Sequence, residues 1–171
     1  MSEHDFGFRT DFYTFAPEDL AKQIPDFKIL REVGNATYLA WVLNVLGDVR
    51  LAQGREEDAR AVLEEALALA EEAGAADYAL FARAQLARFR PESVPELREA
   101  LAQPKTEGRD DGHRLHWYHL WCATREPADL ERAHAALEDA IAAAPDEYKE
   151  SLVEGNRLNR DIRAAWGSGP K

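Results

Sequence analysis

Apolar residues recur at helical spacing between residues 36 and 73, and the rest of the chain is arranged around this stretch. From residue 36 the apolar positions follow the three- and four-residue spacing of a single helical face: Leu39, Val42, Leu43, Leu46 and Val49. Asn35 can cap the start, because its side-chain oxygen accepts a free N–H of the first turn. Gly54 suits the left-handed turn that ends a helix. The pattern therefore predicts one helix over residues 36–53.

A second stripe follows after a turn of three residues and predicts a helix over residues 57–73, which Gly74 ends. The positions expected to face inward are apolar: Ala59, Val62, Leu63, Ala66, Leu67 and Ala70. The positions expected to face outward are charged: Glu56, Glu57, Arg60, Glu64 and Glu65. Two such helices joined by a short turn must pack antiparallel. Gly47 and Ala59 are small where these helices would cross, which allows close approach.

The remainder of the chain reads as further helical pairs. A middle unit after Gly74 has one striped helix, a break at Pro91, and a second helix that Ser93 would cap, with Glu96 at the capping-box position. A polar loop is expected over residues 104–112, a third unit over residues 113–144, and a closing pair of helices within residues 147–166. Strand-like alternation is scarce, so the predicted class is all-α.

Both ends of the chain differ from these units. Residues 1–16 contain five aromatic residues without a helical stripe, which favours an extended arm that docks on the helices. The alternatives are that the arm fills the groove of this protein or of a neighbouring copy, or that it is disordered. Residues 17–34 are expected to form one or two short helices that brace the first hairpin. Residues 167–171 are expected to be a disordered tail.

The spacing within the first hairpin resembles the tetratricopeptide repeat, a helix–turn–helix unit of about 34 residues. The positions that match are Leu43, Leu46, Gly47, Gly54, Ala59, Leu63 and Ala66. A second match is formed by Trp117, Leu120, Ala133, Leu137, Ala140 and Pro145. The interval between the two has room for one further repeat of about 34 residues and a short insertion. The resemblance implies about three hairpins over residues 35–146, stacked as a short right-handed solenoid.

The end of the chain also resembles the C-terminal repeat arrays of bacterial signalling proteins, such as regulators with ATPase or kinase modules. The residues that carry this likeness are Pro145, Tyr148, Asn159, Arg160 and Trp166. None of the nucleotide-binding motifs of such proteins occurs in this sequence.

Charge and composition narrow the functional classes. The 171 residues carry a net charge of −11 with a pI near 4.9, which leaves no basic stripe for nucleic acid. A single cysteine cannot form an internal disulfide, and no apolar run reaches membrane-spanning length. We therefore expect a cytoplasmic protein that binds neither nucleic acid nor membrane.

The resemblance implies that the first helix of each unit lines a concave groove. The groove residues would be Trp41, Asn44, Asp48 and Leu51 in the first unit, and Leu115, Tyr118, Cys122 and Arg125 in the third. Some repeats of this family bind a terminal carboxylate through Lys and Asn, but Asn44 and Asp48 occupy those two positions here. Asp48 would repel a carboxylate. The alternative is that the N-terminal arm covers Trp41 and Tyr118.

Three places in the sequence carry residues that could support catalytic or metal chemistry. His113, His116, His119 and Cys122 recur every three residues, so neighbouring pairs on a helix can share a metal, or they are partly exposed residues beside Trp117, Leu120 and Trp121. Cys122 has only His119 as an evident activating partner. The carboxylates of residues 56–65 are most simply a solvated face. We expect no catalytic residue, no cofactor and no metal site.

The leading hypothesis is therefore a non-catalytic adaptor that binds a protein or peptide, and the acidic balance favours a basic partner. The alternative is a self-associating structural or regulatory module of a signalling system, which would make the protein a homo-oligomer. A remote alternative is a metal-binding sensor that uses the histidine stripe.

Overall fold

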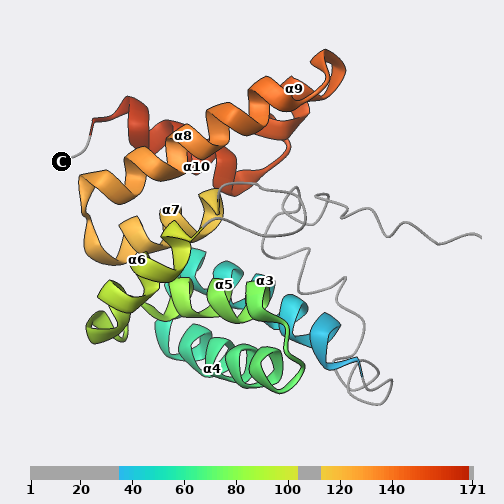
Figure 1. Cartoon of the computed structure of the whole chain (residues 1–171), viewed down its shortest axis with the longest axis vertical. Helices are drawn as coiled ribbons and strands as arrows, with labels where there is room; N and C mark the ends of the chain where they lie inside the picture. The colour runs from blue at the N-terminus through green and yellow to red at the C-terminus, as the bar shows by residue number, and fades with distance from the viewer. Residues whose placement is uncertain (1–34, 104–112, 170–171) are drawn as a thin grey trace, which may run out of the picture.

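The computed structural model describes residues 35–103 and 113–169, and within these ranges the chain is entirely helical. Eight α-helices and one 3₁₀ turn follow one another along these ranges (Figure 1). The class predicted from the hydrophobic pattern is confirmed. None of the described helices combines the length and apolar content that crossing a bilayer requires. The predicted arm, the bracing helices and the loop over residues 104–112 lie outside the described residues.

The first hairpin consists of α3 (Ala36–Ala52) and α4 (Glu56–Glu72), within one residue of the predicted bounds. Asn35 caps α3 as expected, because its side-chain oxygen accepts a hydrogen bond from the Tyr38 N–H at 3.0 Å. Gly54 has φ of +73°, the left-handed conformation that glycine adopts without strain. The hairpin turn therefore forms where the sequence placed it.

The small residue at the helix crossing has a direct packing role. A Cβ atom added to Gly47 would lie 2.3 Å from Leu63 Cδ2, far inside van der Waals contact. Leu63 itself has no exposed surface. The absence of a side chain at residue 47 therefore lets α4 approach α3 closely.

The middle unit departs from the prediction at its second helix. It contains α5 (Ala76–Leu86), a 3₁₀ turn over Pro91–Ser93, and α6 (Val94–Ala102). The expected cap at Ser93 is wrong: its hydroxyl donates to the Arg90 carbonyl oxygen at 2.7 Å and makes no capping bond to α6. The turn that precedes α6 uses the hydroxyl, so the capping box does not form.

The last four helices are α7 (Arg114–Thr124), α8 (Pro127–Ala143), α9 (Asp146–Glu154) and α10 (Arg157–Gly167). The pair α9 and α10 matches the predicted closing helices. The predicted tail begins one residue too early, because α10 includes Gly167, and residues 170–171 lie outside the described residues.

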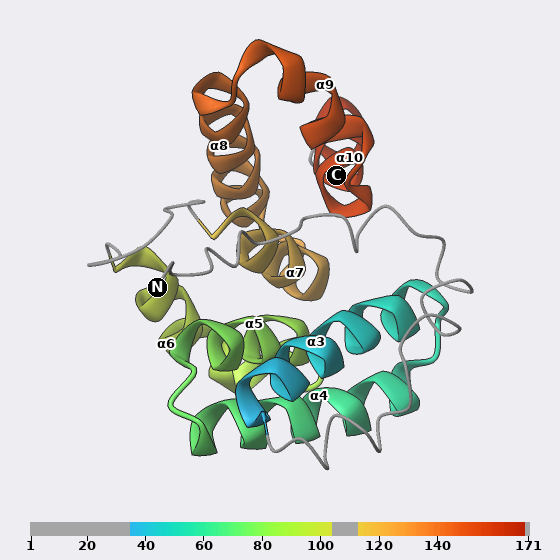
Figure 2. The same cartoon turned by 90° about the vertical axis from the view of Figure 1, so that its right-hand side faces the viewer.

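The helices pack as a series of neighbours. α4 packs on both α3 and α5, α5 also contacts α3 and α7, and α7 contacts α8. α10 contacts α8, α9 and α7, and α8 also contacts α9. In Figure 2 the layer of α3, α4 and α5 lies below α7, with α8 and α10 above it. α5 thus contacts both α3 and α7, and we call these three helices the helix row.

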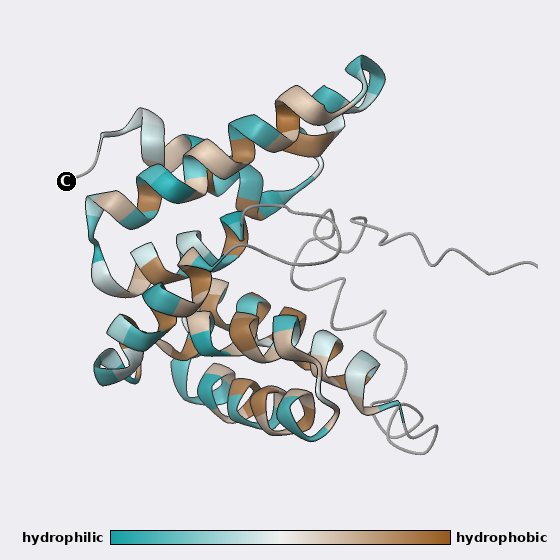
Figure 3. Ribbon diagram, viewed as in Figure 1, coloured by the Kyte–Doolittle hydropathy of each residue, from teal (hydrophilic) through white to brown (hydrophobic). Residues whose placement is uncertain are grey.

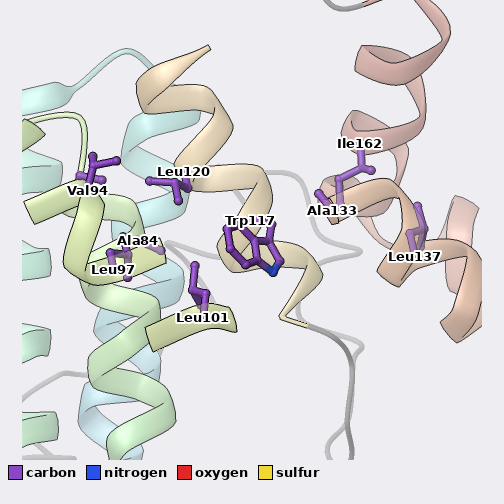
Figure 4. Packing of buried hydrophobic residues seen from close by; sticks show 10 residues of the cluster. Ala84, Val94, Leu97, Leu101, Trp117, Leu120, Ala133, Leu137 and Ile162 are labelled. Carbon is purple, nitrogen blue, oxygen red and sulfur yellow. The ribbon is translucent and has the colours of Figure 1, made fainter. Parts of the chain in front are cut away.

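Hydrophobic and hydrophilic residues both occur along the helices, as the ribbon coloured by hydropathy shows (Figure 3). One core cluster draws residues from five helices: Ala84, Val94, Leu97, Leu101, Trp117, Leu120, Ala133, Leu137 and Ile162 (Figure 4). A second cluster joins α3, α4 and α5 through Leu39, Leu43, Val62, Ala66 and Ala82. The larger cluster holds the C-terminal helices against the middle of the chain.

Candidate functional site

The eight predicted groove residues lie on α3 and α7 and at the end of α7, but they are not equally accessible. Trp41, Leu51, Leu115, Tyr118 and Cys122 are half-buried, and Arg125 is exposed. Asn44 and Asp48 are buried, with 0% and 4% of their surface exposed. The two polar residues at the centre of the predicted groove are therefore enclosed by other parts of the chain.

Asn44 connects α3 to α5. Its Nδ2 donates a hydrogen bond to the Tyr78 carbonyl oxygen at 3.0 Å. Gln85 Nε2 donates in return to the Asn44 backbone carbonyl oxygen at 3.2 Å and to the Asn44 side-chain Oδ1 at 3.4 Å. A buried amide that both donates and accepts is satisfied without a ligand, so Asn44 here fixes the packing of two first helices.

Asp48 lies one helical turn beyond Asn44 and joins three helices. Its Oδ2 pairs with Arg157 Nη2 at the start of α10. Its Oδ1 lies 3.6 Å from His119 Nε2 on α7. Arg157 also pairs with Asp161, at 2.7 Å, one turn further along α10. We call Asp48, His119, Arg157 and Asp161 the Asp48 cluster.

Burial dominates the electrostatics of the Asp48 cluster. It raises the pKa of Asp48, although the guanidinium of Arg157 and, at longer range, that of Arg88 oppose this. Burial and, to a smaller extent, the same two arginines together lower the pKa of His119 to about 3. His119 is therefore neutral near pH 7, and Arg157 supplies the positive charge that faces the Asp48 carboxyl group.

The histidine stripe lies inside the protein rather than on its surface. We expected partly exposed residues, but His113, His116 and His119 are all buried. His116 and His119 pack against Phe81 of α5, with ring centroids 5.0 and 5.4 Å apart. Within residues 35–103 and 113–169, no three histidine, cysteine, aspartate or glutamate side chains are placed to share a metal ion. The stripe forms part of the interface between α5 and α7.

Cys122 and Tyr118 do not present activated groups. Burial raises the pKa of the Cys122 thiol, although Tyr118, Arg88 and Arg125 oppose this. Burial also raises the pKa of Tyr118 above its usual range. The thiol and the phenol therefore stay protonated near pH 7, which disfavours a thiolate nucleophile at this position.

Two aromatic pairs remain accessible on the first helices. On α3, Tyr38 and Trp41 have ring centroids 5.3 Å apart, and Tyr38 is 42% exposed. On α7, half-buried Tyr118 and Trp121 have ring centroids 5.6 Å apart. The Arg125 guanidinium lies 4.5 Å from the centroid of the Trp121 ring. These pairs are the partly exposed aromatic surface of the helix row.

Sequence reasoning did not identify Gln85 or Arg157 as members of the site. Arg157 lies 109 residues from Asp48 along the chain. Gln85 appears in the sequence as one polar residue of a striped helix. No local pattern distinguishes either residue from other polar helix residues, so only the packing of α5 and α10 onto α3 reveals their roles.

Comparisons with protein-family models, curated proteins and solved structures give no match to this chain.

Proposed function

We propose that the protein is a non-catalytic, tetratricopeptide-repeat-like adaptor that binds a basic protein or peptide. The observation that supports this best is the accessible aromatic pair on each of α3 and α7, Tyr38 with Trp41 and Tyr118 with Trp121. Partly exposed tyrosine and tryptophan side chains are frequent anchors in protein interfaces, where a few such residues contribute most of the binding energy.

The arrangement of the helices supports one shared binding face. α5 packs against both α3 and α7, so the two aromatic pairs lie on the two outer members of the helix row. The exposed guanidinium of Arg125 stacks on the Trp121 ring and forms a polar rim beside this aromatic pair. An extended peptide that crosses the row would meet an apolar anchor position on each outer helix.

The charge of the chain favours a basic partner. A net charge of −11 attracts a positively charged protein and speeds its encounter more than it strengthens the final complex. Raising the salt concentration to roughly 0.5 M shortens electrostatic screening to a few ångströms. We therefore expect the association rate to fall with salt while dissociation changes less.

The test begins with identification of a partner by cross-linking in cells, followed by measurement of its Kd with purified full-length protein. We expect Trp41→Ala and Tyr118→Ala each to cost about 2 kcal/mol of binding, or roughly thirtyfold in Kd. Tyr148→Ala is the matched control, because Tyr148 is 57% exposed and lies on α9, away from the helix row. Equal effects of all three substitutions would contradict the proposed face.

A further inference from the structure

The ion pair between Asp48 and Arg157 is buried on one side and accessible on the other. The Asp48 side chain is 6% exposed, whereas the Arg157 side chain is 26% exposed. A buried carboxylate without its cation is strongly unfavourable, so this position needs a guanidinium or ammonium group from some source. We propose that Asp48 is the receptor for an arginine side chain of a basic partner, and that Arg157 occupies this receptor in the unbound protein. This inference rests on the proposed function and names the chemistry of its partner.

The groups around Asp48 favour arginine over lysine. One carboxylate oxygen faces Arg157 Nη2, and the other lies beside His119 Nε2 at 3.6 Å. That nitrogen is buried and makes no hydrogen bond to any described residue. A planar guanidinium can address both oxygens of one carboxylate, whereas an ammonium group is a single point charge.

Arg157 has a second carboxylate to which it can turn. Its Nη1 already lies 2.7 Å from Asp161, whose side chain is 37% exposed and sits one turn along the same helix. When a partner arginine takes Asp48, Arg157 keeps this second ion pair. The exchange therefore leaves neither arginine without a carboxylate.

The exchange does not require α10 to leave its place. Leu158 and Ile162 are almost fully buried, and Asn159 Oδ1 accepts a hydrogen bond from Arg114 Nε of α7 at 3.1 Å. These contacts hold the helix, while Arg157 is half-buried at its start. Displacement of Arg157 therefore requires the movement of one side chain only. Arg157 acts as an internal competitor: it lowers the apparent affinity of Asp48 for a partner arginine in proportion to the fraction of time that Arg157 occupies Asp48.

The test uses Nα-acetyl-arginine amide as the probe and follows its binding to the full chain by NMR titration. We expect Arg157→Ala to bind the probe at least about tenfold more tightly than the natural protein, because the internal competitor is gone. Nα-acetyl-lysine amide should bind more weakly, and the double variant Asp48→Asn with Arg157→Ala should show no saturable binding. Equal binding to the single and double variants would overturn the proposal.

A second variant keeps the buried ion pair intact. Asp161→Asn removes the alternative partner of Arg157 and should strengthen the pairing of Arg157 with Asp48, so this variant is expected to bind the probe more weakly than the natural protein. Asp146→Asn is the control, because that carboxylate is 95% exposed and pairs with Lys149 on α9. Unchanged or tighter binding to Asp161→Asn would contradict the exchange even if Arg157→Ala failed to fold.

The same variants separate this inference from the proposed function. Should a basic partner bind Asp48→Asn as tightly as the natural protein, the adaptor function would stand and the arginine receptor would be refuted. Saturable, Asp48-dependent binding of the probe would support the receptor even if no basic protein bound the chain.

Discussion

At the scale of single residues, Asp48 shows how burial and a distant partner together define a chemical environment. On α3 it is one more polar residue between apolar ones, yet Arg157 and His119 enclose it. Burial raises its pKa and lowers that of His119, so the two shifts change folding stability in opposite directions as the pH falls. A carboxylate that is costly to leave unpaired is also one that can select a cationic ligand.

Acid should weaken the protein through His119. Its pKa is lowered from 6.5 to about 3, so between these values the unfolded chain binds a proton that the folded protein does not. Stability therefore falls as the pH falls through this window. Replacing His119 by Gln removes this loss, which amounts to about 2 kcal/mol at pH 5. Urea unfolding of both proteins at pH 7.5 and at pH 5 measures the difference.

The control for this measurement is Phe81→Leu, which disturbs the same packing without removing a titratable group. It should cost similar stability at both pH values. If His119→Gln shows the same acid dependence as the natural protein, titration of His119 in the unfolded chain is not the cause.

At the scale of elements, the first hairpin forms where an apolar stripe, a short turn and a small residue coincide. Gly47 against Leu63 sets the approach of α3 and α4. Contacts between hairpins are of a different kind and include charged groups. Asp129 on α8 is 2% exposed and accepts two hydrogen bonds from Arg98 of α6, at 3.1 and 2.7 Å. Thr124 also donates to it at 3.0 Å.

The ion pair between Arg98 of α6 and Asp129 of α8 should contribute far more folding free energy than a surface ion pair. Arg98→Ala leaves a buried carboxylate without its cation, and we expect a loss of about 3–5 kcal/mol of folding free energy. Arg83→Ala is the matched control, because its pair with Glu71 is about half exposed on both sides. That substitution should cost less than about 1 kcal/mol. Chemical denaturation of the two variants gives the comparison, and equal losses would contradict the assigned role.

At the scale of the whole molecule, one core cluster carries the connection between the middle and the end of the chain. Trp117 of α7 packs between residues of α5 and α6 on one side and residues of α8 and α10 on the other. The first hairpin has its own cluster with α5. Stacked repeats contact mainly their neighbours, so the two parts should respond differently to damage.

Leu137→Ala tests this difference. Leu137 is fully buried on α8, and its truncation should cost about 2–5 kcal/mol. In a stack of repeats, the substitution should raise the rate of amide hydrogen exchange in α7 to α10 and change it much less in α3 and α4. Uniform loss of protection along the chain would instead indicate a single cooperative bundle. Ala70→Gly on α4 is a companion variant, in which the loss of hydrogen-exchange protection should occur in the first hairpin instead.

The sequence by itself determined the helices and most of their limits. Apolar spacing, glycine and proline act over a few residues, so α3, α4, α9 and α10 begin and end close to the predicted positions. The local pattern gave a wrong prediction at Ser93, whose hydroxyl donates to the Arg90 carbonyl oxygen instead of capping α6. The membership of the helix row in a solenoid and the identity of the partner stay predictions.

Only the tertiary structure decided what Asn44, Asp48 and the histidine stripe touch. Spacing places these residues on particular helix faces, but burial depends on which distant segment packs there. Gln85 encloses Asn44, and Arg157 reaches Asp48 across 109 residues of sequence. The electrostatic energy of such a contact depends on the distance between the charges and on their desolvation in three dimensions. Neither quantity can be derived from a local pattern of residues.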